Sequence, residues 1–336
     1  MPDETITRFE TAGGTRIYRL PMQVFPNLRA YAHVVIAGDY VALIDVGSGQ
    51  GQSDAHLRDG FARLASEWGE HIRWTDLDRI VITHAHIDHH GGLNMVRTLT
   101  DAPIAIHELD RRVIVHHEER LALTRFRMGV FLRRAGVDEA RCAKLLGMYS
   151  WSKDVFRSVA VEDVLRDGDL LDGRFRIIHV PGHCPGQICL QLDDVLFTAD
   201  HVLPTVAIFL SPESLNAATG VDHFLLSLRK VKGLPGVRLA LGGHSKPVHD
   251  LDEAVTKIES IQAGRIARVY DACAEPHSVA ELTTALYPAV GAYDELLALQ
   301  KVGAYIEYLD QRGLLAIANL DEVAENEAGV PRYRAE

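Results

Sequence analysis

The stretch "RIVITHAHIDHH", residues 79–90, places four histidines and an aspartate directly after a short apolar run. Such a run is typical of a buried strand. Side chains alternate between the two faces of a strand, so His84 and His86 point the same way where this strand ends. Asp88 and His89 follow at the turn into the next segment. The pattern predicts a metal site, in which the strand histidines hold one ion and the next two ligands reach a second ion nearby.

The remaining ligands should come from other segments, because a zinc ion takes about four ligands. Three later apolar runs each end in one nitrogen or oxygen ligand: "VPGH" in His183, "LFTAD" in Asp200 and "LALGGH" in His244. Two metals about 3.5–4 Å apart, bridged by an aspartate such as Asp200, can hold a hydroxide between them. The alternative is that these histidines only cap strands or satisfy core hydrogen bonds. The agreement of motif, order and spacing favours the metal site.

The motif H-x-H-x-D-H, followed by Gly91 and Gly92, resembles that of the metallo-β-lactamase superfamily. The pattern is closer to the dinuclear, glyoxalase-II-like one than to that of the true β-lactamases. The resemblance implies an α/β (α+β) fold, a four-layer αββα sandwich. It also implies a ligand set: His84, His86 and His183 for the first metal, Asp88, His89 and His244 for the second, and Asp200 as the bridge.

The segment "LIDVGSG" matches an early strand of the same family. Asp45 would lie behind the metals there and orient a ligand histidine through a hydrogen bond. The alternative is an ordinary turn aspartate. The expected cofactors are two divalent metal ions, with zinc first, although histidine and aspartate ligands without a thiolate also suit iron or manganese.

The chain divides into a predicted catalytic domain, residues 1–250, and a C-terminal winged-helix-like domain, residues 251–336. A long, charged helical insertion is expected at about residues 108–165. Periodicity predicts helices at 51–68 and 91–99. Strands are predicted at 16–21, 30–38, 40–49, 79–86, 102–108, 175–183, 187–192, 194–201 and 237–244.

The C-terminal segment is predicted to form helices at 252–273, 278–288 and 292–313, followed by a short β-wing. Ser278 and Glu281 fit a capping box at the second helix. From residue 251 onward there are fifteen acidic and seven basic residues, the wrong balance for binding phosphates of nucleic acid. We expect a structural lid or an oligomerisation surface instead, and either this segment or the insertion could form a homodimer contact.

Composition excludes several classes of protein. The net charge of −11 disfavours nucleic acid and anionic membranes as partners, and no apolar run is long enough to cross a bilayer. The start "MPDETITRFE" has no export signal, and the four cysteines form no C-x-x-C pair, so we expect a cytoplasmic protein.

The resemblance implies hydrolysis, in which a metal-bound hydroxide attacks an electrophilic carbonyl or phosphorus and Asp88 also helps to take the proton. A small acyl compound is the expected substrate, with thioesters first and esters or lactones next. The alternatives are a phosphodiesterase or ribonuclease of the same superfamily, and a non-catalytic protein that carries metal and binds a ligand.

Three residues are candidates for substrate contacts. His201 lies beside a predicted ligand and is interpreted as a cleft residue, and Tyr149 belongs to an apolar set in the insertion that could cap the cleft. Lys246 lies two residues beyond His244 and could meet an anionic group. For Tyr149 and Lys246 the alternatives are packing and solvent exposure. The loop after Asp200, residues 201–214, is expected at the edge of the cleft.

Overall fold

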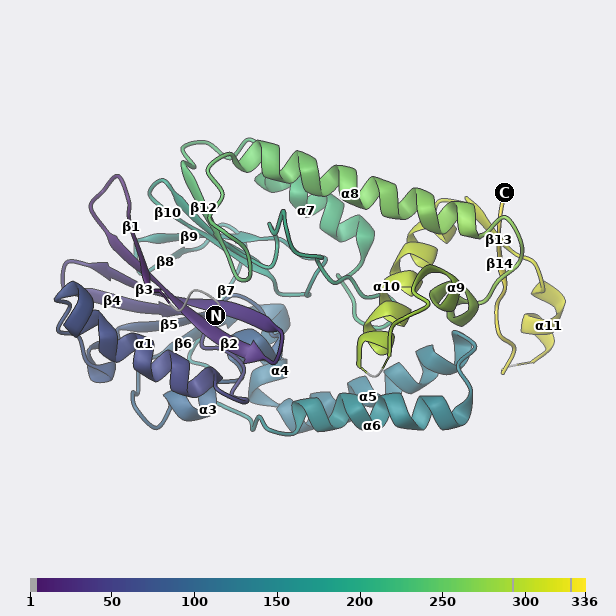
Figure 1. Ribbon diagram of the computed structural model, residues 1–336, viewed down its shortest axis with the longest axis horizontal. Coiled ribbons are helices and arrows are strands. Elements are labelled where there is room, and N and C mark those ends of the chain that lie inside the picture. The colour runs from purple at the N-terminus through teal and green to yellow at the C-terminus, as the bar shows by residue number, and fades with distance from the viewer. Residues whose placement is uncertain (1–4, 292, 327) are drawn as a thin grey trace.

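Two β-sheets are stacked with helices on both outer sides (Figure 1). This computed structural model describes residues 5–291, 293–326 and 328–336. The predicted αββα arrangement is confirmed. Three buried apolar clusters correspond to its layers, one between the sheets and one beneath the helices on each outer face.

The first sheet contains, in the described residues, seven strands in sequence order. Neighbours from β1 to β4 run antiparallel, and those from β4 to β7 run parallel. The strands are β1 (Thr7–Glu10), β2 (Arg16–Phe25), β3 (Leu28–Ala37), β4 (Tyr40–Ile44), β5 (Arg79–Ile82), β6 (Ile104–His107) and β7 (Asp163–Leu165).

Alternation along these strands divides the side chains between two cores. In β4, Ala42 and Ile44 face the second sheet, whereas Val41 and Leu43 face the helices. Helix α1 (Ser53–Trp68) lies where residues 51–68 were predicted and packs its buried apolar stripe on that outer face. The short elements η1 (Trp74–Asp76), α2 (Ile87–His90) and α3 (Leu93–Val96) complete this part of the chain.

The second sheet has the strand order β12-β11-β10-β9-β8. In β10, Ile188 and Leu190 face the first sheet and Cys189 faces the helices on the other side. The strands are β8 (Leu170–Leu171), β9 (Phe175–His179), β10 (Ile188–Leu192), β11 (Val195–Ala199) and β12 (Leu239–Gly242). Because β11 and β12 are parallel, their carboxyl ends, which precede Asp200 and His244, lie at one edge.

The helical insertion consists of α4 (Glu108–Val115), α5 (His117–Arg134) and α6 (Glu139–Lys153). The predicted boundary at 165 is too late, because residues 163–165 form β7 and pair with β6. Helices α5 and α6 pack side by side, and α6 lies against the C-terminal helix α10 (Tyr293–Asp310) (Figure 1).

The C-terminal segment begins at α8 (Leu251–Ala272), followed by α9 (Val279–Leu286) and α10. Strands β13 (Leu315–Ile317) and β14 (Tyr333–Ala335) form a two-stranded antiparallel sheet around α11 (Leu320–Glu325). The capping box of Ser278 and Glu281 is confirmed. The order of elements agrees with the predicted helices and wing, and the winged-helix assignment remains a prediction. The predicted start of the third helix at residue 292 lies outside the described residues.

Helix α7 (Val221–Val231) was not predicted, although Phe224, Leu228 and Val231 have helical spacing and are buried. It covers the second sheet together with α8 (Figure 1). The loop predicted at residues 201–214 is confirmed, since these residues form no helix or strand. None of the helices described is both long and apolar enough to span a membrane.

Candidate metal centre

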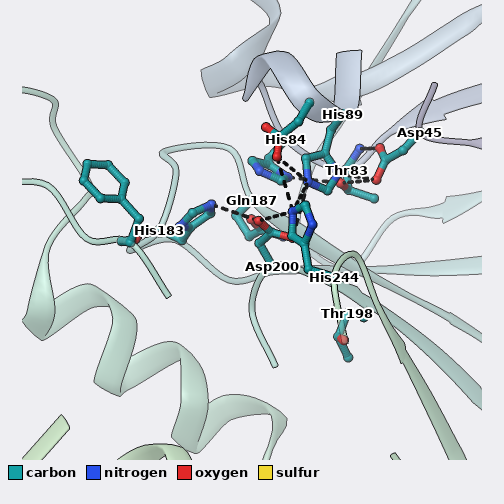
Figure 2. A network of polar contacts seen from close by, with 12 residues as sticks. Asp45, Thr83, His84, His89, His183, Gln187, Thr198, Asp200 and His244 are labelled. Carbon is teal, nitrogen blue, oxygen red and sulfur yellow. Dashed lines mark hydrogen bonds and ion pairs between the residues drawn. The ribbon is translucent and has the colours of Figure 1, made fainter. Parts of the chain in front are cut away.

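The seven predicted ligands meet at one edge of the two sheets. Figure 2 shows His84, His89, His183, Asp200 and His244 of this set. The segment after β5 supplies His84 and His86, and α2 begins at once, so that Asp88 and His89 turn toward the same space. Three groups of ligand atoms each lie within 4.8 Å of one another. The groups are His84 with His86 and His183, His84 with His89 and Asp200, and Asp88 with His89 and His244.

Asp200 lies between the two halves of the centre. One carboxylate oxygen is 3.3 Å from Nε2 of His89, and the other is 3.5 Å from Nε2 of His183 and 3.2 Å from Nε2 of His244. Asp88 Oδ2 lies 3.3 Å from Nε2 of His244. The structure therefore brings all seven side chains together in the predicted grouping, and their role as ligands remains a prediction.

Nε2 of His84 and Nε2 of His183 are buried without a hydrogen-bond partner. An unsatisfied buried polar atom costs about 1–3 kcal/mol. Imidazole nitrogen and carboxylate oxygen are both common ligands of divalent transition metals. The residues present fit a pair of such ions, because the same cations would satisfy these atoms and balance the carboxylates.

Hydrogen bonds made by Nδ1, the ring nitrogen that is not the predicted ligand atom, fix the orientation of three imidazoles. Nδ1 of His89 bonds to Asp45 at 2.8 Å, Nδ1 of His183 to the Phe209 carbonyl at 2.7 Å, and Nδ1 of His244 to the Arg29 carbonyl at 2.6 Å. Each bond places the proton on Nδ1 and leaves Nε2 free to bind a cation.

Asp45 lies behind His89, where the sequence predicted it. Its carboxylate also accepts hydrogen bonds from the backbone N–H and the hydroxyl of Thr83, both at 2.9 Å. These contacts fix Asp45 between the ends of β4 and β5. Its contact with His89 is the one expected, and its effect on metal binding stays a prediction.

The electrostatics of the centre divide the histidines into two kinds. Burial lowers the pKa of His84 and of His183, so both are neutral. Burial also acts to lower the pKa of His89 and His244, but the neighbouring carboxylates, with Asp200 first, outweigh it. The pKa of His89 lies well above its usual value, and that of His244 rises to about 10.

The two carboxylates show the matching effect. Burial acts to raise the pKa of Asp200 and of Asp88, but His244 and His89 outweigh it and hold both values below normal. Without metal, two protonated histidines therefore balance two ionised aspartates.

Three glycines allow the backbone segments of the centre to approach closely. A Cβ at Gly91 would collide with the carbonyl of Ser48, and one at Gly92 with the carbonyl of Val46. A Cβ at Gly243 would lie 2.5 Å from Oδ1 of Asp200. Side chains at these positions would push the motif away from the Asp45 loop or displace Asp200.

Asp110 is a site residue that sequence reasoning missed. It is fully buried on α4, and its carboxylate accepts hydrogen bonds from Ala85 N–H at 2.8 Å, Gly186 N–H at 2.8 Å and Cys184 Sγ at 3.2 Å. Ala85 lies between His84 and His86, and Cys184 follows His183. One carboxylate thus ties together the two segments that carry the first group of histidines. No periodicity or spacing in the sequence marks it.

The candidate substrate residues lie in different surroundings. His201 is fully buried with its ring edge-on to Phe224 at 5.3 Å, which leaves no surface for a substrate and disfavours its predicted role. Tyr149 is half-buried on α6 and packs against the helical core, and Lys246 is exposed.

Other apolar residues of the insertion are likewise divided between buried and exposed positions. Met128 and Leu132 are buried in the helical core, whereas Phe126 and Trp151 are 70% and 79% exposed. His90, beside the ligand His89, is buried against Phe156.

The stacked sheets and the histidine–aspartate centre define a metallo-hydrolase architecture. The family model described as the metallo-beta-lactamase superfamily matches residues 27–244. The chain belongs to this superfamily.

Among known proteins, the chain is 36% identical over 132 residues to the acyl-coenzyme A thioesterase MBLAC2 of Bos taurus. This match spans 36% of the chain and 40% of that relative. The probable metallo-hydrolase YqjP of Bacillus subtilis (strain 168) is 21% identical over 82% of the chain and 86% of its own length. A metallo-beta-lactamase family protein from Thermus thermophilus has the same fold, with a TM-score of 0.76, 23% identity, and coverage of 95% of this chain and 98% of that chain.

Asp110→Asn should lower the apparent affinity for divalent metal by about 10–100-fold, the usual effect of removing a group that orients metal ligands. The new amide would present N–H groups to a pocket lined by donors. The measurement is a competitive titration of zinc against a chromophoric chelator.

Asp194→Asn is the matched control, because Asp194 also accepts a backbone hydrogen bond, from Ala12 at 2.8 Å, and has a largely buried side chain. A folded Asp110→Asn protein with unchanged zinc affinity would contradict the positioning role.

Metal binding should release protons, because His89 and His244 have raised pKa values in the metal-free protein and must lose a proton to bind metal. Below pH 10 the apparent affinity should therefore rise with pH, by about tenfold per unit for each proton displaced. Calorimetry in buffers of different ionisation enthalpy measures the number released. His244→Gln should reduce that number by about one, and equal release from both proteins would refute the assignment.

Proposed function

We propose that the chain is a metal-dependent hydrolase that converts an acyl thioester and water into a carboxylic acid and a thiol. The observation that carries this proposal is the gathering of seven predicted ligands from four segments, with the unpartnered Nε2 atoms of His84 and His183 among them. Membership of the superfamily and the similarity to an acyl-coenzyme A thioesterase support it.

In this proposal, His84, His86 and His183 would hold one divalent ion, Asp88, His89 and His244 would hold the other, and Asp200, which lies between the two sets, would serve both. Zinc is the metal we expect first, with iron or manganese as alternatives. When bound, such a pair supplies a nucleophile from water at neutral pH and polarises the carbonyl oxygen of the substrate.

The chain's own residues contribute orientation and proton transfer. Asp45 keeps the imidazole of His89 in the tautomer that binds metal through Nε2. Asp88 is the more exposed of the two carboxylates, at 13% of its side chain against 8% for Asp200. We assign to a carboxylate oxygen of Asp88 the proton lost by the attacking water.

The thioester is preferred to an ester or lactone because of the leaving group. A thiol has a pKa near 8.5 and departs readily as the anion, whereas an alkoxide needs a proton donor. Burial lowers the pKa of His90 and of His201 to about 3, so neither of these neighbouring histidines carries a proton at neutral pH, and the proton accepted by Asp88 is the one left for a leaving group. Esters and lactones remain the second substrate class.

The alternative of a phosphodiesterase uses the same centre on a different substrate. The net charge of −11 acts against the approach of a nucleic acid. A small-molecule substrate therefore remains the proposed partner.

His84→Ala and Asp200→Ala should each reduce turnover of acyl thioesters by about a hundredfold or more, because each removes a ligand from the centre. The measurement is steady-state hydrolysis by the metal-loaded protein over a panel of thioesters, oxygen esters, lactones and a phosphodiester. His71→Ala, at an exposed histidine outside the motif, is the control and should retain activity. The proposal fails if the metal-loaded chain hydrolyses no acyl compound of the panel, and intact metal binding without turnover would indicate a ligand-binding protein.

A further inference from the structure

A groove of about 260 Å³ lies between the loop after β11 and helix α8. Residues 203–208 form the loop side, and Ile258, Ile261, Gln262 and Arg265 form the helix side. We call it the α8 groove. Most of its walls are apolar, and Gln262 is held in place by the hydroxyl of Tyr305 at 2.5 Å.

The loop side of the α8 groove is close in sequence to residues of the metal centre. It begins three residues after Asp200 and ends immediately before Phe209, whose carbonyl accepts the hydrogen bond from His183. The same loop therefore connects residues of the metal centre with the wall of the groove. Helix α8 then leads from the second sheet to the C-terminal helices (Figure 1).

Three cationic side chains gather where the groove reaches those helices. Arg265 lines the groove, and Lys301 Nζ and Arg268 Cζ lie 5.7 Å and 5.8 Å from the centroid of the Tyr287 ring. We call Arg265, Arg268 and Lys301 the cationic cluster. Burial and then the charge of Arg265 lower the pKa of Lys301, while Asp294 acts in the opposite direction.

The cations of the cationic cluster lack a carboxylate partner in the part of the chain that the structure describes. Among the described residues, no carboxylate lies within 4.0 Å of any of its three cations. The segment from residue 251 nevertheless has fifteen acidic residues against seven basic ones, so carboxylates that could pair with these cations are plentiful. Cations that repel one another in a partly buried position are stabilised by an anion that binds among them.

We propose that the α8 groove holds the arm of an acyl thioester whose thiol carrier bears phosphates, as coenzyme A does, and that the cationic cluster binds those phosphates. This inference rests on the proposed thioesterase function and names the substrate class. The thioester carbon lies at the metal centre, and the phosphates lie at the far end of the groove.

The span of α8 from the start of the groove to the cationic cluster is comparable with the length of such an arm. Ile258 and Arg268 are ten residues apart on α8, or about 15 Å at 1.5 Å per residue. The arm of coenzyme A has about a dozen atoms between sulfur and the first phosphorus, and extends to roughly 15 Å at the spacing of an extended backbone.

The experiment compares one acyl group on two carriers, coenzyme A and N-acetylcysteamine, which has no phosphate. In the metal-loaded full chain, Arg265→Gln and Lys301→Gln should each raise KM for the coenzyme A thioester about tenfold, the loss expected for one charged hydrogen bond, with kcat little changed. Hydrolysis of the N-acetylcysteamine thioester should not change. Added salt should raise KM for the coenzyme A thioester in the unmodified protein and have less effect in the variants.

Lys257→Gln is the matched control, because Lys257 is an exposed lysine on the same helix and does not line the groove. It should leave both substrates unaffected. Arg268→Gln, at the most exposed cation of the cluster, repeats the test if either other variant fails to fold.

The outcomes separate this inference from the proposed function. If both thioesters are hydrolysed and each substitution changes KM for the two substrates by the same factor, the proposed thioesterase function stands and the phosphate site is overturned. A change that follows acyl-chain length rather than carrier overturns it too, because the groove then holds the acyl chain. If no thioester is hydrolysed, calorimetry with free coenzyme A still decides: binding weakened by Arg265→Gln but not by Lys257→Gln supports the cluster, and absence of binding refutes it.

Discussion

The charge of Asp200 among the surrounding imidazoles is the interaction on which the centre depends. Its carboxylate is only 8% exposed and lies within 3.5 Å of three histidines that come from three separate segments. An isolated buried carboxylate would be strongly unfavourable, so this arrangement requires cations nearby, either protons on His89 and His244 or metal ions. The two sheets and their loops are arranged so that this requirement is met at one edge.

Much of the centre follows from local sequence. The ligands lie at the ends of apolar runs, and strand alternation together with tight turns is enough to place each one. Asp110 could not be found in this way, since it acts on Ala85 and Gly186, which are 25 and 76 residues away in the chain. The same reason hides the cationic cluster, because Lys301 meets Arg268 only through the packing of α10 on α8. The helical spacing of Phe224, Leu228 and Val231 in α7 is visible in the sequence, but these residues follow soon after the predicted loop of residues 201–214.

The division into two domains is less sharp in the structure than in the sequence. Met128 of α5, Leu145 of α6, Val255 of α8 and Leu299 of α10 belong to one apolar cluster, which also covers the second sheet. The insertion and the C-terminal helices therefore share their core with the catalytic fold. This shared core brings segments that are distant in sequence together, and in this way the groove beside α8 adjoins the loop after Asp200.

The contact of Gly91 and Gly92 with the carbonyls of Ser48 and Val46 links the histidine motif to the loop that contains Asp45. Neither loop can be rebuilt alone, because a larger residue in one has no room beside the backbone of the other. A designer who transplants this catalytic edge to a new scaffold must therefore move both pieces as a unit, although about forty residues separate them in the chain.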